Sequence, residues 1–130
     1  FRSALRMAQR SQEHFESAIA MKCIPWVTAA LFHIGLQYAQ VAEMVMESPV
    51  PARLSESHKK TYCTELYGNA QQVYAKAIEA WYRTIQFSQN VGVRNRWVRK
   101  ARAYLSAGKL DKAGEVEACL GRTGSVARNE

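Results

Sequence analysis

The sequence predicts an all-α protein of about five helices, and three observations carry this prediction. No segment alternates apolar and polar residues with the period of two that β-strands require. No proline falls between residues 59 and 90, so a single helix can extend over about residues 58–89. One apolar stripe continues through that range in steps of three or four, which keeps side chains on one helix face: Tyr62, Leu66, Ala70, Val73, Ala77, Trp81 and Ile85.

Two helices are predicted before the long one. Residues 3–21 carry a narrow apolar side that includes Ala4, Ala8 and Phe15. A second helix over residues 25–46 begins with a proline, which at the first helical position loses no needed hydrogen bond. It is apolar on more than one side, so we expect it at the centre of the packing. The prolines at 49 and 51 end it, because each removes a backbone donor and restrains the residue before it.

The remaining boundaries follow from capping residues and glycines. Ser55 is placed to cap the long helix, and Gly68 inside that helix costs about 1 kcal/mol, so a break there is the main alternative. Two shorter helices are predicted over residues 94–106 and 110–120, separated by Gly108. Residues 121–130 are rich in glycine, serine and charge, so we expect a single helical domain over 1–120 and a flexible tail over 121–130.

The composition is that of one globular domain. The 130 residues are 48% hydrophobic and 22% charged, which argues against disorder. The chain begins with Phe1 rather than methionine, so we expect it to be a piece of a longer repeat protein. No run approaches the roughly 18 apolar residues of a membrane span; the best candidate, residues 24–45, is interrupted by His33, Gln37, Gln40 and Glu43.

The positive charge is concentrated near the C-terminus. Residues 1–90 hold 9 basic and 7 acidic side chains, whereas residues 91–130 hold 9 basic and 4 acidic ones. Such a skew is typical either of a solubilising surface or of a nucleic acid, acidic protein or anionic lipid partner.

The three cysteines do not indicate a metal site. Cys23, Cys63 and Cys119 are far apart, form no C-x-x-C pair and have no histidine at ligand spacing. We therefore expect no metal and no cofactor. Pairing of two of them in an oxidising compartment stays open.

Residues 97–113 resemble a tetratricopeptide repeat (TPR). That family places an aromatic early in its first helix, small residues where paired helices cross, and an alanine after a turn glycine. Trp97, Ala101, Tyr104, Gly108 and Ala113 match those positions. The resemblance implies antiparallel helical hairpins that bind partner proteins.

A second match lies upstream. Tyr74, Ala77, Trp81 and Ile85 are similar to the second helix of such a repeat, although Gln71 and Gln72 stand where a turn glycine belongs. The match therefore indicates a divergent repeat whose helices have fused.

The longer arrangement, from residues 47–51 through 76–79 to 92–98, is similar to TPR proteins of the bacterial cell envelope, some of which serve in gliding-motility machinery. The resemblance implies a non-catalytic scaffold module in the periplasm or at the envelope, which binds other proteins and no small-molecule substrate. A cytoplasmic location is the alternative.

The densest basic cluster lies within residues 94–102. Basic residues interleaved with Trp97 can hold phosphates and stack on a base. A helical wheel, however, puts Trp97, Ala101 and Tyr104 on one side and the charges on the other, as in an ordinary solvated helix face. An acidic protein or lipid partner and a nucleic acid remain alternatives. The cluster comprises Arg94, Arg96, Arg99, Lys100 and Arg102.

One short pattern suggests chemistry. Arg53 and His58 have the spacing found in helical ribonucleases of the HEPN class, where the arginine stabilises a phosphate and the histidine moves a proton. Chance explains so short a pattern better, and no phosphate loop, H-E-x-x-H or G-x-S-x-G is present. We therefore expect no enzyme.

Aromatic residues off the main apolar stripe are the other contact candidates. Tyr82 and Phe87 fall outside that stripe, so they are free either to contact a partner or to pack on a neighbouring helix. The predicted partner-binding residues are Tyr82, Phe87, Arg94, Arg96, Arg99 and Lys100.

Overall fold

A computed structural model shows five α-helices, and it describes residues 2–20, 24–92, 94–108 and 110–129. The helices are α1 (Arg2–Ala20), α2 (Ile24–Met46), α3 (Glu56–Val91), α4 (Arg96–Ala107) and α5 (Lys112–Asn129). No strand occurs among these residues, so the all-α class is confirmed. No helix in the described ranges is long and apolar enough to cross a membrane.

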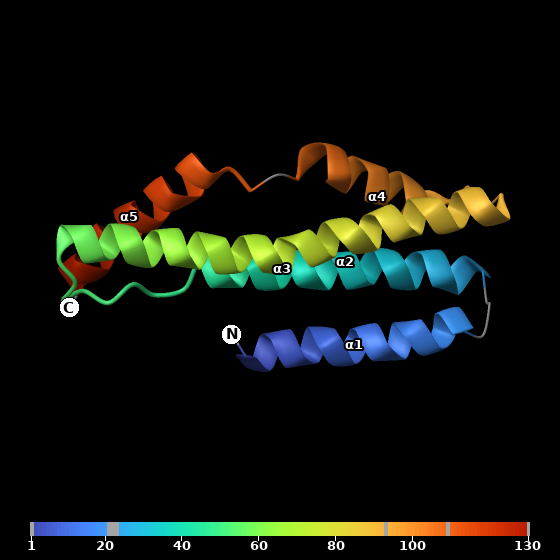
Figure 1. Ribbon diagram of the computed structural model, residues 1–130, viewed down its shortest axis with the longest axis horizontal. Coiled ribbons are helices and arrows are strands. Elements are labelled where there is room, and N and C mark those ends of the chain that lie inside the picture. The colour runs from blue at the N-terminus through green and yellow to red at the C-terminus, as the bar shows by residue number, and fades with distance from the viewer. Residues whose placement is uncertain (1, 21–23, 93, 109, 130) are drawn as a thin grey trace.

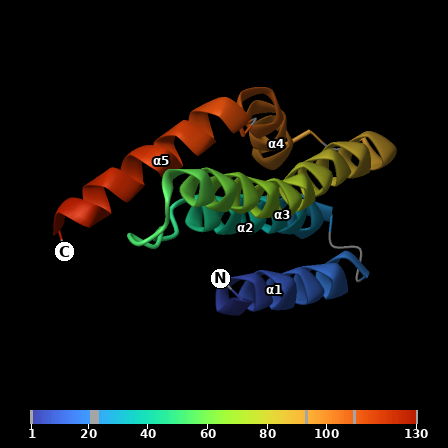
Figure 2. The same ribbon diagram turned by 60° about the vertical axis from the view of Figure 1, so that its left-hand side comes forward.

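Helices α2 and α3 form the central antiparallel pair (Figure 1). Helix α1 packs against α2, whereas α4 and α5 lie on α3, with α4 also reaching α2. The turned view in Figure 2 keeps the same order, with α1 at one side and α4 and α5 at the other. Helix α2 is central as predicted, because it is apolar around most of its circumference and most of it is buried.

The core lies between α2 and α3. Trp81 is its largest fully buried side chain, and its Nε1 donates a hydrogen bond to the Phe32 carbonyl oxygen over 3.2 Å. Small α3 residues on the predicted stripe, Ala70 and Ala77, are fully buried. They let α2 and α3 approach closely enough for their apolar side chains to interlock.

Helix α3 is continuous and capped at both ends. Ser55 Oγ accepts a hydrogen bond from the His58 amide over 3.3 Å, as the sequence predicts. Gly92 ends the helix in the left-handed conformation, with φ of 71°. Gly68 does not break α3, and a Cβ built on it meets no atom within 4 Å.

Helices α4 and α5 follow one another along α3 and do not pack as a hairpin. Helix α4 covers the C-terminal half of α3, and α5 extends toward its N-terminal end (Figure 1). Tyr74 Oη donates to the Gly108 carbonyl over 2.6 Å, and Tyr67 Oη donates to the Leu110 carbonyl over 3.2 Å. These bonds hold the connection extended along α3, so it does not fold back as the TPR resemblance implies.

Helix α5 is tied to the central pair by a disulfide. Cys63 of α3 and Cys119 of α5 are bonded to one another, and both are fully buried. The Arg122 guanidinium donates to the Met46 carbonyl of α2. The helix continues to Asn129, although the sequence predicts a helix end near 120 and a flexible tail beyond it.

Candidate interaction surface on helix α4

Asn95 positions the N-terminus of α4 on the central pair. Its Oδ1 accepts hydrogen bonds from the amides of Trp97 and Val98, over 3.0 and 3.2 Å, and so caps the helix. Its Nδ2 donates to Thr28 Oγ1 of α2 over 2.8 Å. One side chain therefore both starts α4 and attaches it to a fully buried residue of α2.

Aromatic rings hold the inner face of α4. The ring of Phe32 lies 5.6 Å from the ring of Trp97 and 5.5 Å from that of Tyr104. The Tyr104 ring also lies 5.1 Å from the buried Trp81, and Trp97 lies 4.9 Å from His33. These contacts join α4 to both central helices, so the outer face of α4 has a rigid base.

Two cations of the cluster stack on Trp97. The Arg96 guanidinium lies 4.4 Å from the centre of the Trp97 ring, and Lys100 Nζ lies 5.1 Å from it. Both are close enough for cation–π attraction, worth about 0.5–1 kcal/mol at exposed sites. Trp97 is therefore already engaged by Phe32, His33 and these two cations, which leaves it a poor platform for a nucleic acid base.

The other arginines of the cluster line a groove between α3 and α4, of about 810 Å³. No acidic residue contributes to its described walls, and Val98, which is almost fully buried, supplies an apolar part of them. The groove lies where the end of α3 and the start of α4 meet. Its lining comprises Ser88, Gln89, Gly92, Arg94, Asn95, Val98, Arg99 and Arg102.

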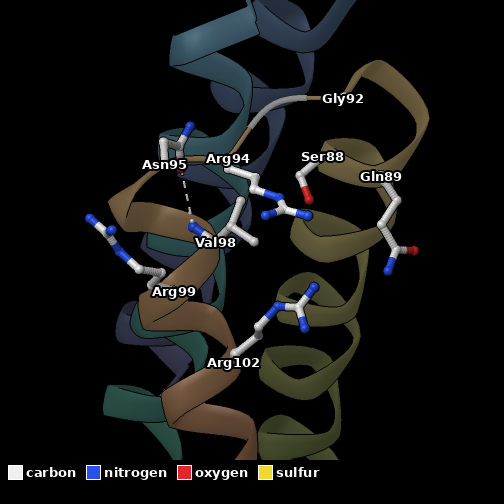
Figure 3. A pocket seen from close by; sticks show the side chains of 8 residues that line it. All are labelled: Ser88, Gln89, Gly92, Arg94, Asn95, Val98, Arg99 and Arg102. Atoms are coloured by element: carbon white, nitrogen blue, oxygen red, sulfur yellow. Dashed lines mark hydrogen bonds between the residues drawn. The ribbon is translucent and has the colours of Figure 1, made fainter.

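The arginines do not all point the same way. In Figure 3 the side chains of Arg94 and Arg102 extend toward α3, whereas Arg99 extends to the opposite side of α4. Ser88 and Gln89 lie on the α3 wall that faces them. Two guanidinium groups thus project into the groove, and each offers planar donors that suit a carboxylate or a phosphate.

The five cations are not neutralised within the protein. Arg94, Arg96, Arg99, Lys100 and Arg102 are all exposed, and none forms an ion pair with a carboxylate of the described ranges. Unpaired charges of one sign on a rigid face raise the local concentration of oppositely charged ligands.

Partial burial and the basic cluster together lower the pKa of His33. Its pKa lies below the ordinary value of 6.5, first because partial burial disfavours the charged ring, then because Lys100 and Arg96 repel it. The sequence predicts a hydrogen-bonded interior histidine, whereas the structure places His33, which is half-buried, against the Trp97 ring.

The structure separates the six predicted contact residues into four groups. Arg94 and Arg99 line the groove, and Arg96 and Lys100 stack on Trp97. Tyr82 is 57% exposed on α3, so its ring is available for contact. Phe87 is partly buried and packs against the core, which makes it a packing residue.

Six of the eight groove residues were not singled out for binding from the sequence, among them Arg102, Ser88 and Gln89. Arg102 belongs to the basic cluster but gave no sign of lying in the groove, and Ser88 and Gln89 carry no motif. They come together only because α4 packs against the end of α3. A helical projection of both helices could have placed Arg102 on the side of α4 that faces α3. It could not have shown how deep the groove is.

Arg53 and His58 are not part of the groove. Both are exposed at the start of α3, where His58 Nδ1 lies 2.9 Å from the capping Ser55 Oγ. The histidine is thus engaged in the cap of α3. Among the described residues, no group of three histidine, cysteine or acidic side chains is arranged to hold a metal ion.

Comparison with protein-family models, curated proteins and solved structures finds no match to this chain.

Proposed function

We propose that this chain is a non-catalytic interaction module that binds an acidic segment of a partner protein through α4. The observation that carries the proposal is the exposed surface around α4, where five cations lie and none pairs with a carboxylate of the described ranges. No acidic residue occurs between residues 94 and 107 to oppose a negative partner. Such a face favours fast encounter with acidic proteins and disfavours basic ones.

The setting that we propose is a bacterial envelope assembly, such as motility machinery, in the periplasm or at the cell envelope. The Cys63–Cys119 disulfide supports an oxidising compartment, because cytosolic thiols are normally kept reduced. The TPR-like residues Trp97, Tyr104 and Gly108 support a scaffold role, although their two helices lie along α3.

A nucleic-acid partner is less well supported. The aromatic of the basic cluster, Trp97, is already engaged by neighbouring rings and cations, so stacking on a base would require these contacts to rearrange. A HEPN-like nuclease is also less well supported, because His58 is exposed in the first turn of α3, where its ring contacts the capping Ser55.

The test is a crosslinking pull-down with the full-length protein in native envelope and cytosol fractions. The variant Arg96→Glu/Arg99→Glu/Lys100→Glu reverses three charges on α4. The matched control, Arg2→Glu/Arg6→Glu/Arg10→Glu, reverses three exposed charges on α1. We expect nuclease-resistant capture of envelope proteins that the α4 variant loses and the α1 variant retains.

Two outcomes would contradict the proposal. Equal capture by the wild type and both variants would show that α4 is not the binding face. Recovery of nucleic acid that nuclease abolishes would replace the protein partner with DNA or RNA.

A further inference from the structure

We infer that the groove between α3 and α4 binds an extended segment whose two carboxylates are four residues apart, one at Arg94 and one at Arg102. This inference rests on the proposed function and specifies the partner segment. Its basis is that these two arginines, and not Arg99, point from the α4 side toward α3 (Figure 3).

The spacing follows from the geometry of the helix. Asn95 caps α4, and Arg102 is seven positions farther on, which is roughly 10 Å along the axis at ~1.5 Å per residue. Arg94 immediately precedes the cap, so the positions of the two arginines in the chain are slightly farther apart than that length. Side chains of an extended chain alternate between two faces, so two carboxylates on the same face are an even number of residues apart. Four residues at about 3.3 Å each cover about 13 Å, which bridges the two positions.

The groove walls suit a peptide between these two ends. Gln89 on the α3 side is exposed and offers both a donor and an acceptor to a peptide backbone. Val98 provides an apolar part of the groove wall, against which a small apolar side chain of the peptide can lie. Charge at both ends and an apolar centre favour the pattern acidic–x–apolar–x–acidic, in which all three side chains lie on one face of the extended segment.

The same features argue against a nucleic acid in this groove. A phosphate backbone carries charge on every nucleotide and gains most from a continuous track of cations. Here Arg99 contributes to the groove wall, but its side chain extends to the opposite side of α4, and Arg96 and Lys100 lie over the Trp97 ring. Only two guanidinium groups therefore project into the groove, which is not a continuous track of cations.

The experiment is an NMR titration of the arginine Nε–Hε signals with two short peptides of identical composition. The first, Ala-Glu-Ala-Val-Ala-Glu-Gly, has glutamates four positions apart. The second, Ala-Glu-Glu-Val-Ala-Ala-Gly, has them adjacent. A thymidine oligonucleotide of equal charge is the third probe, and Arg94 and Arg102 signals are assigned from their variants.

The variants separate the groove from the rest of the helix. Arg94→Gln/Arg102→Gln removes the two inward cations. Arg96→Gln/Lys100→Gln removes two cations from the same helix outside the groove. All four residues are exposed, so both variants are expected to fold, which circular dichroism verifies.

We expect the spaced peptide to shift the Arg94 and Arg102 signals and to bind at least threefold more tightly than the adjacent one. Its affinity falls at least tenfold in the groove variant and less than twofold in the other. Equal affinities for both peptides, or equal losses in both variants, would overturn the groove site. The pull-down on α4 would still report on the proposed function. Tighter, Arg94- and Arg102-dependent binding of the oligonucleotide would overturn the peptide as occupant.

Discussion

The indole of Trp81 lies directly against the backbone of Gly35. A Cβ built on Gly35 would lie 2.6 Å from Trp81 Cδ1, closer than carbon atoms can approach. The absence of a side chain at Gly35 therefore creates the space that the largest core residue occupies. The Trp81 ring in turn lies 5.1 Å from the ring of Tyr104. The contact between Gly35 and Trp81 therefore also supports the packing of α4 on the central pair.

Gly35→Ala should destabilise the protein, since the added methyl group must displace the indole. We expect a loss of about 1–3 kcal/mol in the free energy of unfolding, typical of overpacking in a core. Urea unfolding measures it. The matched control is Gly68→Ala in α3, where the methyl group meets no atom and should add about 0.5–1 kcal/mol. Equal effects of the two substitutions would contradict the packing described.

Asn95→Ala should loosen the start of α4. It removes the cap on Trp97 and Val98 and the hydrogen bond to Thr28, so we expect a loss of about 1–3 kcal/mol. Asn95→Asp keeps the capping oxygen but not the donor to Thr28, and its loss should be intermediate. Thermal unfolding compares the three proteins. Wild-type stability of Asn95→Ala would contradict the anchoring role.

Loss of the disulfide should destabilise the attachment of α5. Cys63 and Cys119 are 56 residues apart, and closing a loop of that size stabilises by about 4 kcal/mol on the chain-entropy account. Cys63→Ser, Cys119→Ser and the double variant should lose similar amounts, because each removes the same bond. Urea unfolding measures these losses, and non-reducing peptide mapping identifies the disulfide that each variant contains. Cys23→Ser is the control, because it keeps the bond between Cys63 and Cys119.

His33 should make stability depend on pH. Its folded pKa is lower than its unfolded value near 6.5, so the unfolded chain binds more protons as the pH falls below that value. The stabilisation by neutral His33 is therefore complete above about pH 6.5 and is lost toward acid. The slope is at most about 1.4 kcal/mol per pH unit for one proton.

Unfolding curves between pH 5 and 7.5 measure this dependence. The slope should shrink in His33→Gln and persist in His14→Gln, a variant of an exposed histidine on α1. A slope that is unchanged in His33→Gln would contradict the role assigned to this residue.

Local rules predicted most of the helices. Proline positions and the apolar stripe placed the long helix within two residues of Glu56–Val91, and Ser55 was identified as its cap. These features act over a few residues, so the sequence contains the necessary information.

The packing of α5 depended on contacts distant in sequence. From the sequence alone, the turn at Gly108 predicts a hairpin of two helices. In the structure, the hydroxyl groups of Tyr67 and Tyr74 hold this connection along α3. Three cysteines allow three single pairings, and only the approach of α5 to α3 selects Cys63 and Cys119.

The candidate site was predicted only in part. The basic cluster is visible in the sequence because its residues are neighbours, and Arg94, Arg96, Arg99 and Lys100 were identified from it. The groove is different, because Ser88 and Gln89 reach it from another helix. Which cations face the groove and which stack on Trp97 depends on how α4 is rotated against α3, and no local pattern determines that rotation.

Site-specific photo-crosslinking in native envelopes tests the central claim most directly. A photoreactive residue replaces Gln89 on the groove wall or, as a control, the exposed Glu117 on α5. We predict that position 89 crosslinks to a protein with an acidic segment, and that Arg94→Gln/Arg102→Gln abolishes this crosslink. Equal crosslinking from both positions, or a product at position 89 that contains nucleic acid, would contradict the account.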